Sequence, residues 1–320
     1  MPAPKVSVIT VICGNNIEFM GKCLISLLEN TNYANVEFIV VSDAEYEMTR
    51  FISNTCEYNA SVKYIFREHK SSNSSNRNLG ALHSASDSKY LLFADSDVLY
   101  TNNQWLTNLV QVLEEHTEIG IIGGGDGTTL GHFCWIDNET GILINDVMDF
   151  NGVMPDHPVE MMIIPGYSML FRKDIFEYIG RWDEGFVPVY GEDIDICIRC
   201  ILAGYKVYGV FNDGVKHLYR TTNENNSSER LVSDRHRVWL TVASLRRLAI
   251  KYRGILGTSR QNSYSEWVNS LSVIAANGQT RLANIKMLPP VSSNGKLEQM
   301  YLPTKDTSDI AEIFSSLDFS

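Results

Sequence analysis

The chain has 320 residues, of which 44% are hydrophobic, 20% charged and 10% aromatic. This composition is ordinary for a soluble globular enzyme and excludes a disordered chain, a fibre and a disulfide-stapled miniprotein. The 27 Lys and Arg residues against 38 Asp and Glu residues give a net charge of −11. That balance argues against nucleic acid as a partner, because non-specific binding needs a basic face to neutralise phosphates.

The sequence also bears on location. No apolar run reaches the ~20 residues of a membrane-spanning helix. The apolar segment 6–13 is followed by Gly14 and Asn15 instead of a small-residue cleavage site, so we predict a strand there and not a signal peptide. Cys197 and Cys200 are closely spaced but lack the second pair that a structural zinc site needs. We expect reduced core thiols and a cytoplasmic protein.

The first half of the chain alternates predicted strands and helices. Buried apolar runs predict strands at 6–12, 36–41, 62–66, 90–94 and 119–122. Helical periodicity predicts helices at 17–29, 74–85 and 103–115. This alternation implies right-handed crossovers and a largely parallel sheet, whose ligands bind beyond the carboxyl ends of the strands. Asp43 and the Asp95–Asp97 turn follow two such strand ends.

The middle of the chain changes character. Residues 133–137 and 142–146 flank Asn138–Gly141 and predict a hairpin. Further strands are predicted at 168–171 and 205–210, and helices at 173–179 and 192–203. The polar stretch 221–229 predicts a linker, and residues 288–320 predict an extended tail.

Three acidic positions are the main candidates for chemistry: Asp43, the pair Asp95 and Asp97, and the neighbours Glu192 and Asp193. Two carboxylates one residue apart at a strand end point to opposite sides of the chain, so one can bind a hard cation and the other a ribose hydroxyl. Mg²⁺ and Mn²⁺ accept one or two protein carboxylates together with diphosphate oxygens and water. The alternative is a surface turn, where the same spacing is common.

Several motifs occur in a definite order along the chain. They are Val6-Ser7-Val8-Ile9, Val40-Val41-Ser42-Asp43, Asn76-Arg77-Asn78-Leu79-Gly80, Phe93-Ala94-Asp95-Ser96-Asp97, Gly180-Arg181-Trp182-Asp183-Glu184-Gly185-Phe186, Gly191-Glu192-Asp193-Ile194-Asp195-Ile196-Cys197-Ile198-Arg199, Gly204-Tyr205-Lys206-Val207 and His217. Together they resemble the family-2 inverting glycosyltransferases of GT-A fold, over residues 5–219. The resemblance implies an α/β GT-A domain at 1–219, with a mostly parallel central sheet flanked by helices, and a C-terminal helical extension and tail at 220–320.

The resemblance also implies site residues. The nucleotide-sugar site would consist of Val11, Asp43, Arg77, Asp95, Ser96, Trp182 and Glu192. Within it, Asp43 would hold the nucleotide base, Arg77 would lie near the base or the diphosphate, and Asp95 would contact the ribose or the sugar. Asp97 would ligate a divalent cation, Mn²⁺ or Mg²⁺, with His217 as a further candidate ligand. Asp193 would be the general base that accepts the proton of the acceptor hydroxyl.

Two departures from the family pattern bear on the donor. Residues 11–14 read Val-Ile-Cys-Gly where family members usually carry Pro-Thr-Tyr-Asn, and Ser71–Ser75 replaces a Gly-rich segment. The contact with the nucleotide base and the choice of donor sugar therefore stay open. We expect a UDP-linked donor in preference to GDP or dTDP, and a glycan or glycoconjugate acceptor.

Some of these residues also have a plainer explanation. Glu192 and Asp193 open a predicted helix, where acidic side chains complement the helix dipole. Asp195 and Arg199 are spaced to form an ion pair along one helix face. Trp182 fits core packing as well as stacking on a sugar.

Two further features have no definite role. The glycine-rich segment 123–127 lacks the spacing of a dinucleotide-binding loop, and it fits either a loop over the donor or a plain turn. His132 has no partner at ligand spacing, so we expect an ordinary loop or surface histidine.

The C-terminal hundred residues lie outside the resemblance. Segment 230–253 carries seven Lys and Arg residues against one acid, Asp234, and an apolar stripe at helical spacing: Val238, Val242, Leu245, Ala249 and Tyr252. A helix that packs on the catalytic domain or on a second copy of the chain is one interpretation. A helix peripheral to the inner face of an anionic membrane is the other. We favour packing.

The favoured function is a metal-dependent inverting glycosyltransferase. A sugar nucleotidyltransferase is the enzymatic alternative, but it would carry an Arg in the loop after the first strand, and residues 11–16 have none. A catalytically silent glycan-binding subunit of the same fold is the non-enzymatic alternative. The joint presence of Asp97, Asp193 and His217 argues against it.

Overall fold

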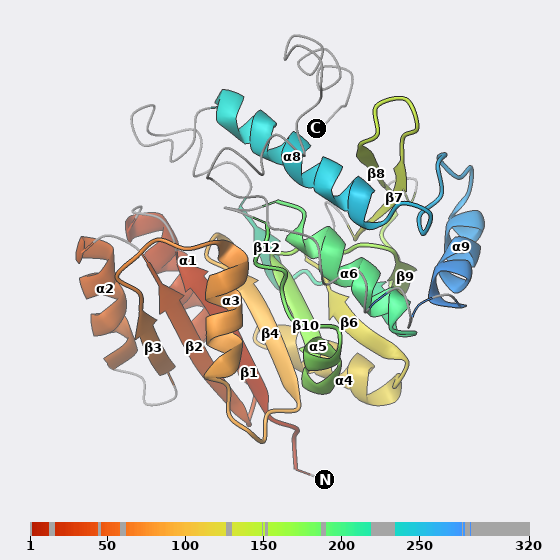
Figure 1. The fold of residues 1–320 in the computed structure, drawn as a ribbon. Helices are drawn as coiled ribbons and strands as arrows, with labels where there is room; N and C mark the ends of the chain where they lie inside the picture. The colour runs from red at the N-terminus through yellow and green to blue at the C-terminus, as the bar shows by residue number, and fades with distance from the viewer. Residues whose placement is uncertain are drawn as a thin grey trace.

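One large sheet forms the centre of the protein. The computed structural model describes residues 2–12, 17–43, 46–57, 62–125, 130–148, 150, 153–186, 190–218, 234–276, 278 and 282. The eight strands of the sheet lie in the spatial order β3 (Val62–Phe66), β2 (Val36–Ser42), β1 (Val6–Ile12), β4 (Tyr90–Asp95), β10 (Ser168–Arg172), β6 (Ile119–Gly123), β11 (Lys206–Gly209) and β9 (Val159–Met161) (Figure 1).

Strand direction divides this sheet into two parts. β3, β2, β1 and β4 are parallel neighbours, as the alternation of strands and helices predicts. β10 runs antiparallel between β4 and β6, while β11 is again parallel to β6 and antiparallel to β9. β9 and β10 therefore run in the same direction, although β6 and β11 lie between them in the sheet. The sheet is therefore mostly parallel, and only β10 and the edge strand β9 run opposite to its other six strands.

The helices and two small ribbons complete the described structure. The helices are α1 (Ile17–Glu29), α2 (Tyr46–Glu57), α3 (Asn73–Leu82), α4 (Trp105–Glu115), α5 (Lys173–Tyr178), α6 (Glu192–Leu202), α8 (Asp234–Lys251) and α9 (Tyr264–Ala276). The ribbons pair β12 (Val215–His217) with β5 (Val98–Tyr100), and β7 (His132–Ile136) with β8 (Leu143–Val147). The β7–β8 pair confirms the predicted hairpin, whereas α2, β5, β9 and β12 have no counterpart in the sequence predictions.

Alternate residues of the strands face two different hydrophobic layers. Ile9 and Phe93 pack on the side covered by α3, α5 and α6, which also receives α8 and α9. Val8 and Leu92 face the opposite side, where α4 contributes Trp105 and its neighbours. This alternation follows from the two-residue period of a strand, and it gives a sheet that is buried on both faces.

Helix α3 lies close against the sheet because of a glycine. A Cβ atom added at Gly80 would lie 2.4 Å from Cγ2 of Ile9 and 3.3 Å from Cγ2 of Val41. The helix begins at a Ser72 cap, whose side chain accepts a hydrogen bond from the Ser75 amide at 3.1 Å. Cap and glycine together fix α3, and with it Arg77, over the carboxyl ends of β1 and β2.

The C-terminal helix α8 packs on the same core. Val242, Leu245, Ala249 and Tyr252 of the predicted apolar stripe are buried in it, which confirms packing on the protein for this part of the segment. The side chain of Val238 and the predicted linker and tail at 221–229 and 288–320 lie outside the described residues. Within the described part of the chain, none of the helices combines the length and apolar character needed to cross a bilayer.

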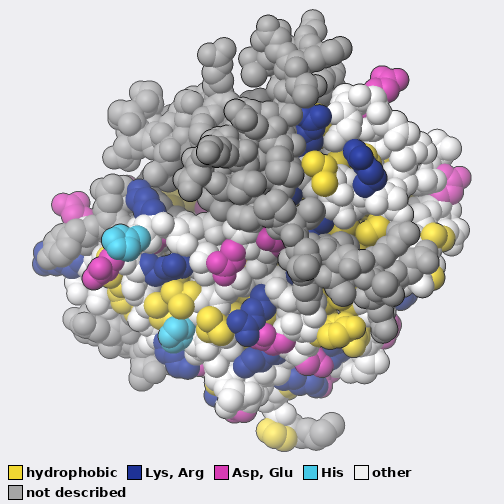
Figure 2. All heavy atoms as spheres, viewed as in Figure 1, with side chains coloured by type: hydrophobic (Ala, Val, Ile, Leu, Met, Phe, Trp, Pro, Cys, Tyr) yellow, Lys and Arg dark blue, Asp and Glu magenta, His cyan; other side chains and the backbone are white. Residues whose placement is uncertain are grey.

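The described cysteines follow the sequence prediction, and the charges on one face of the protein are mixed. Cys23, Cys134, Cys197 and Cys200 are free and buried, which confirms core thiols at these positions. Figure 2 shows Lys and Arg side chains interspersed with Asp and Glu on the face in view, with no continuous basic stripe among the coloured, described atoms.

Replacing Gly80 with alanine tests the fit of α3 against the sheet. We expect Gly80→Ala to lower the free energy of unfolding by about 1–3 kcal/mol, because the new methyl group would overlap Ile9 and force the helix outward. Denaturant unfolding measures this loss. Gly257→Ala is the matched control, since a Cβ there meets nothing within 4 Å, and a comparable loss in both variants would contradict the packing argument.

Candidate active site

The candidate residues gather at the carboxyl ends of the central strands. Asp43 directly follows β2, and Asp95 is the last residue of β4. Val11, next to the end of β1, pairs with Val41 on one side and Asp95 on the other. Its side chain is buried in the core.

A buried guanidinium is the centre of the cluster. Arg77 of α3 is 2% exposed and donates to Asp95 Oδ1 at 2.5 Å and to the Gly166 carbonyl at 3.1 Å. Its second terminal nitrogen lies 3.7 Å from Glu192 Oε1. The guanidinium also lies over the Trp182 ring, 4.5 Å from the ring centroid. The Arg77 guanidinium thus contacts groups of the protein, and it holds the carboxylates of Asp95 and Glu192 near each other.

Glu192 and Asp193 begin α6, which follows Gly191 in a left-handed conformation with φ of 87°. Asp193 Oδ1 accepts a hydrogen bond from the Ile194 amide at 2.8 Å. A Cβ atom added at Gly166 would lie 3.2 Å from Asp193 Cβ and 3.5 Å from its Oδ2. Asp193 is therefore next to the Arg77 cluster, separated from it by Gly166.

Burial controls the ionisation of the two carboxylates beside Arg77. Burial and the Asp193 carboxylate raise the pKa of Glu192 to about 7, against the effect of Arg77. Burial also raises the pKa of Asp95, with Arg77 lowering it and Asp97 raising it further. Both shifts have the same origin, since a carboxylate removed from water loses more solvation than one neighbouring cation restores.

Asp97 and His217 form a second group beside the first. Asp97 Oδ1 lies 3.2 Å from His217 Nε2, and the β12–β5 ribbon holds them together because Val98 is paired with His217. The His217 ring stacks on Tyr167 at a centroid distance of 4.5 Å. Asp95 and Asp97 thus bind different partners, as the one-residue spacing predicts.

The donor set of this pair suits a divalent cation. A carboxylate oxygen and an imidazole nitrogen are ligands that Mn²⁺ accepts. Among the described residues, no group of three or more His, Cys, Asp or Glu side chains is placed to hold a metal ion. Two protein ligands nevertheless suffice for a cation that completes its shell with diphosphate oxygens and water.

Asp43 is buried and held from the α3 side. Its Oδ2 accepts hydrogen bonds from the Ser71 amide at 2.8 Å and from Asn76 Nδ2 at 2.9 Å. The serine-rich segment that precedes α3 therefore orients this carboxylate. Ser96 is half-buried in the turn between Asp95 and Asp97.

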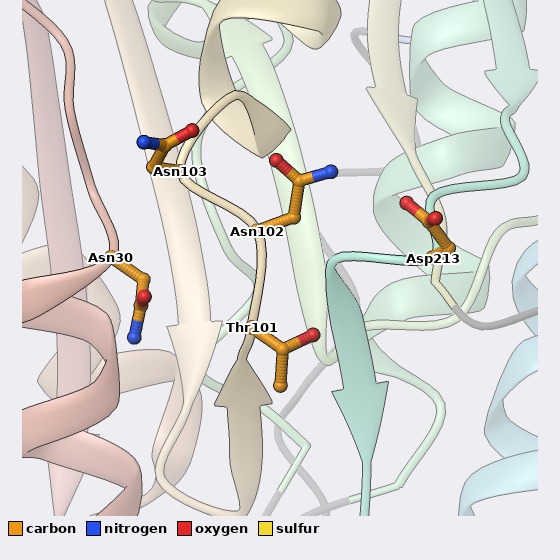
Figure 3. Close-up of a pocket in the computed structure, with 5 residues that line it drawn as sticks. All are labelled: Asn30, Thr101, Asn102, Asn103 and Asp213. Carbon is orange, nitrogen blue, oxygen red and sulfur yellow. The ribbon is translucent and has the colours of Figure 1, made fainter.

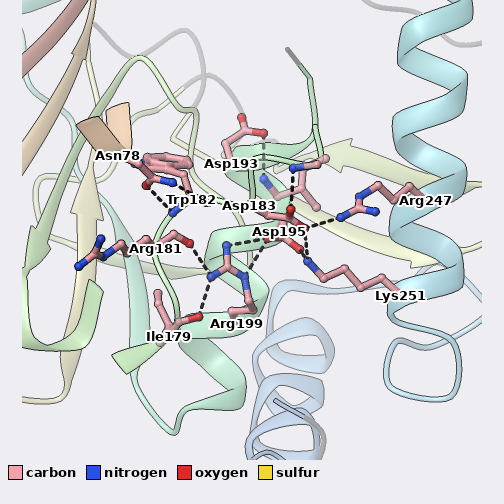
Figure 4. A network of polar contacts seen from close by, with 12 residues as sticks. Asn78, Ile179, Arg181, Trp182, Asp183, Asp193, Asp195, Arg199, Arg247 and Lys251 are labelled. Carbon is pink, nitrogen blue, oxygen red and sulfur yellow. Dashed lines mark hydrogen bonds and ion pairs between the residues drawn. The ribbon is translucent and has the colours of Figure 1, made fainter. Parts of the chain in front are cut away.

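Trp182 is a core residue and does not present its ring to solvent. It is 2% exposed and packs edge-on against Phe93 and Phe171. Asn78 of α3 fixes the backbone at Trp182, accepting from its amide at 3.1 Å and donating to its carbonyl at 2.9 Å (Figure 4). Of the two interpretations of this tryptophan, the observed burial favours core packing. The face of the Trp182 ring contacts the Arg77 guanidinium.

The predicted pair of Asp195 and Arg199 is confirmed, but it is buried. Arg199 NH2 lies 2.7 Å from Asp195 Oδ2, and both side chains are almost wholly inaccessible. Arg199 also donates to the carbonyl groups of Ile179 and Arg181, each at 2.7 Å (Figure 4). The pair therefore ties α6 to the segment that leads into Trp182.

Three residues near the cluster were not selected from the sequence as site residues. Gly166 and Tyr167 precede β10 and contact Asp193 and His217, respectively. His132 begins β7, half-buried; burial lowers its pKa while the carboxylates of Asp193 and Asp146 raise it. No motif marks these positions, because each acquires its neighbours only through the fold.

The glycine-rich segment is explained in part by close packing. A Cβ at Gly124 would lie 1.8 Å from the Val210 carbonyl oxygen, and one at Gly125 would lie 2.4 Å from the Tyr167 hydroxyl. Residues 126–129 lie outside the described residues, so a role as a loop over the donor stays a prediction.

A polar pocket lies away from this site. It is lined by Asn30, Thr101, Asn102, Asn103 and Asp213 (Figure 3). Thr101 follows β5 and Asp213 precedes β12, whereas Asp97 and His217 are at the other end of this ribbon. The pocket is therefore separate from the acidic cluster.

Comparison with known proteins assigns the class and the family. The sequence model for Glycosyl transferase family 2 matches residues 7–180, more than half of the 320-residue chain. With the observed sheet, this match defines a glycosyltransferase of GT-A fold. The chain belongs to glycosyl transferase family 2, which confirms the resemblance; the matched residues end before α6. No curated protein matches the chain.

Solved structures with similar folds include two glycosyltransferases. GalNAc-T7 with UDP, GalNAc and Mn²⁺ superposes with a TM-score of 0.60 at 16% identity, covering 85% of this chain and 55% of that one. The mannosyltransferase PcManGT from Pyrobaculum calidifontis, with GDP-Man and Mn²⁺, gives 0.53 at 13% identity, covering 88% and 74%. The chain therefore spans about half the length of the first structure. At these identities the similarity concerns the fold.

The raised pKa of Glu192 predicts a pH-dependent effect on stability. Between its ordinary value of 4.5 and about 7, folded Glu192 keeps a proton that the unfolded chain has lost, so its contribution to stability falls as the pH rises through this range. Glu192→Gln has no titrating carboxyl group at this position, so the variant lacks this pH-dependent fall in stability. We expect its melting temperature, relative to wild type, to increase from pH 5 to pH 8. Glu115→Gln, which removes an exposed carboxylate of α4, controls for the lost charge; a pH-independent difference for Glu192→Gln would contradict the assignment.

Proposed function

We propose that this glycosyltransferase is an inverting, metal-dependent enzyme that moves a sugar from a nucleoside diphosphate donor to a hydroxyl of a glycan or glycoconjugate. One observation carries the proposal: the Asp97–His217 pair and the Arg77–Asp95–Glu192 cluster lie beside Asp193 at one edge of the sheet. A cation ligand, a sugar-binding carboxylate and a proton acceptor are the groups that such a transfer needs.

The donor would lie along the carboxyl ends of β1, β2 and β4. Asp43 is oriented by its contacts with Ser71 and Asn76, and its second oxygen would receive the nucleotide base. Asp95, held by Arg77, would accept a hydrogen bond from a hydroxyl group of the ribose or the sugar. UDP is the nucleotide we favour. The two similar structures contain UDP in one case and GDP-Man in the other, so both nucleotides belong in the test.

Asp97 and His217 would hold Mn²⁺ or Mg²⁺ against the diphosphate. When bound there, a divalent cation neutralises negative charge on the leaving nucleoside diphosphate. Both similar structures contain Mn²⁺, which supports a cation of this kind. Tyr167, stacked on His217, would keep the imidazole oriented.

Asp193 would act as the general base. The acceptor hydroxyl oxygen forms a bond to the anomeric carbon as the bond from that carbon to the diphosphate oxygen breaks, and the electron pair leaves with the nucleoside diphosphate. The hydroxyl proton passes to Asp193, whose Oδ1 is already bound by the Ile194 amide. Attack opposite the leaving group inverts the anomeric centre. General base catalysis of this kind contributes ~10²–10⁴-fold in rate.

A peripheral contact of segment 230–253 with an inner membrane surface, or with a second copy of the chain, stays a proposal. Arg247 and Lys251, two of the seven basic residues, are buried in ion pairs with Asp183. Binding to anionic lipid would therefore depend on the other basic residues of the segment.

Nucleotide binding tests the donor site. We expect UDP or GDP to bind more tightly in the presence of Mn²⁺ than in EDTA. The reason is that a cation held by Asp97 and His217 would neutralise the charge of the diphosphate. Isothermal titration calorimetry of both nucleotides, with and without the metal, measures the difference. Equal affinities in Mn²⁺ and EDTA would refute the proposed metal-dependent donor site.

Substitutions at Asp193 and Asp97 separate catalysis from binding. Asp193→Asn keeps the shape but removes the proton acceptor, so turnover should fall ~10²-fold or more while UDP–Mn²⁺ binding is retained. Asp97→Asn should weaken metal-dependent binding itself. Release of UDP from a UDP-sugar measures turnover, and calorimetry measures binding. The exposed Asp213→Asn is the control; parallel losses of binding in the Asp193 and Asp97 variants would show that the roles are wrongly assigned.

A further inference from the structure

Lys251, at the end of α8, joins two segments that flank the candidate site. Its ammonium group is buried and contacts Asp183 Oδ2 at 2.8 Å and Asp195 Oδ1 (Figure 4). Asp183 directly follows Trp182, and Asp195 lies in the first turn of α6 together with Asp193. One side chain from outside the family-matched residues thus bridges the loop that follows Trp182 and the helix that carries Asp193.

Asp195 fixes the orientation of the first turn of α6. It is fully buried and bound by Arg199 Nε at 2.8 Å, by the Tyr252 hydroxyl at 2.7 Å and by Lys251. Successive residues of an α-helix are rotated by about 100°, so Asp193 and Asp195 point in nearly opposite directions. Holding Asp195 on the α8 side therefore aims Asp193 away from α8, toward Gly166.

Asp183 fixes the other segment. Besides Lys251, its carboxylate accepts from Arg247 NH2 at 2.7 Å and from the Gly185 amide at 2.8 Å. Lys251 and Arg247 hold the pKa of Asp183 well below its usual range, although burial opposes this, so the carboxylate is ionised. The adjacent Trp182 ring supports the Arg77 guanidinium, and through it Asp95.

We propose that Lys251 is a positioning residue for the transfer reaction, which sets the direction of Asp193 through Asp195 and is assisted by Tyr252. The inference rests on the proposed role of Asp193 as general base. A buried ion network contributes little net stability compared with apolar packing of the same volume, so the inference concerns the geometry that this network fixes. A displacement of about 1 Å at a reacting group can lower a rate ~10²-fold, so this geometry bears directly on turnover.

Two variants of α8 and its end test the inference. Lys251→Met removes the bridge to both carboxylates, and Tyr252→Phe removes only the hydroxyl bound to Asp195, with the ring kept in the core. We expect UDP-sugar hydrolysis with Mn²⁺, measured with UDP-glucose and UDP-N-acetylglucosamine below the melting temperature of each variant, to fall ~10–100-fold in Lys251→Met and less in Tyr252→Phe. UDP–Mn²⁺ affinity should stay within about twofold, because the donor-side contacts remain.

A double-mutant comparison separates positioning from mere structural support. Tyr252→Phe should lower hydrolysis in the wild-type background and have no further effect in Asp193→Asn, and it should speed amide exchange in the first turn of α6. Lys206→Met, which breaks the part-exposed pair with Glu160, is the control and should keep wild-type rates. Wild-type hydrolysis in folded Lys251→Met and Tyr252→Phe would overturn the inference, as would equal effects of Tyr252→Phe in both backgrounds. An active Asp193→Asn enzyme would instead refute the proposed base.

Discussion

The burial of Arg77 is the constraint on which the site depends. Removing a guanidinium from water is costly by several kcal/mol unless carboxylates and carbonyl groups surround it. Here the compensation comes from four separate parts of the chain: Asp95 of β4, Glu192 of α6, the Gly166 carbonyl and the Trp182 ring. Satisfying this one cation therefore requires the central strands and α6 to meet in a single arrangement.

The alternating part of the fold could be predicted because its signals are local. The strand 6–12 and the helix 17–29 were predicted with the bounds that β1 and α1 have, since a buried apolar run and a helical period are both readable from neighbouring residues. β5, β9 and β12 have three residues each, which is too short for a periodicity. The direction of β10 depends on its partners β4 and β6, which are distant in the sequence.

The candidate site was predictable only where a motif reports it. Asp43, Asp95 and Glu192 come from different motifs, and the structure brings them around Arg77 and its helix. Gly166 and Lys251 carry no such signal. Lys251 is 68 residues from Asp183 in the sequence, so the predicted packing of segment 230–253 did not identify the carboxylate that Lys251 binds. Burial also decides between stacking and core packing for Trp182, a choice that its residue type leaves open.

The charges of the site explain why a cation belongs in the proposed reaction. A nucleoside diphosphate is an anion, and it would approach an edge that already carries Asp43, Asp95, Asp97, Glu192 and Asp193. Among the described residues, Arg77, Arg247 and Lys251 are each bound to a carboxylate, so their charges are already compensated by the protein. These three side chains therefore leave the charge of the diphosphate uncompensated, and a bound cation would neutralise it.

The pair Asp97 and His217 offers a cation only two protein ligands, so the affinity for the metal alone should be modest. The diphosphate, in turn, is repelled by the acidic edge until the cation neutralises it. Each ligand therefore raises the affinity for the other, and by thermodynamic linkage it does so by the same factor. A site of this kind would take up metal and donor as one unit and would lose affinity for the metal once the diphosphate departs.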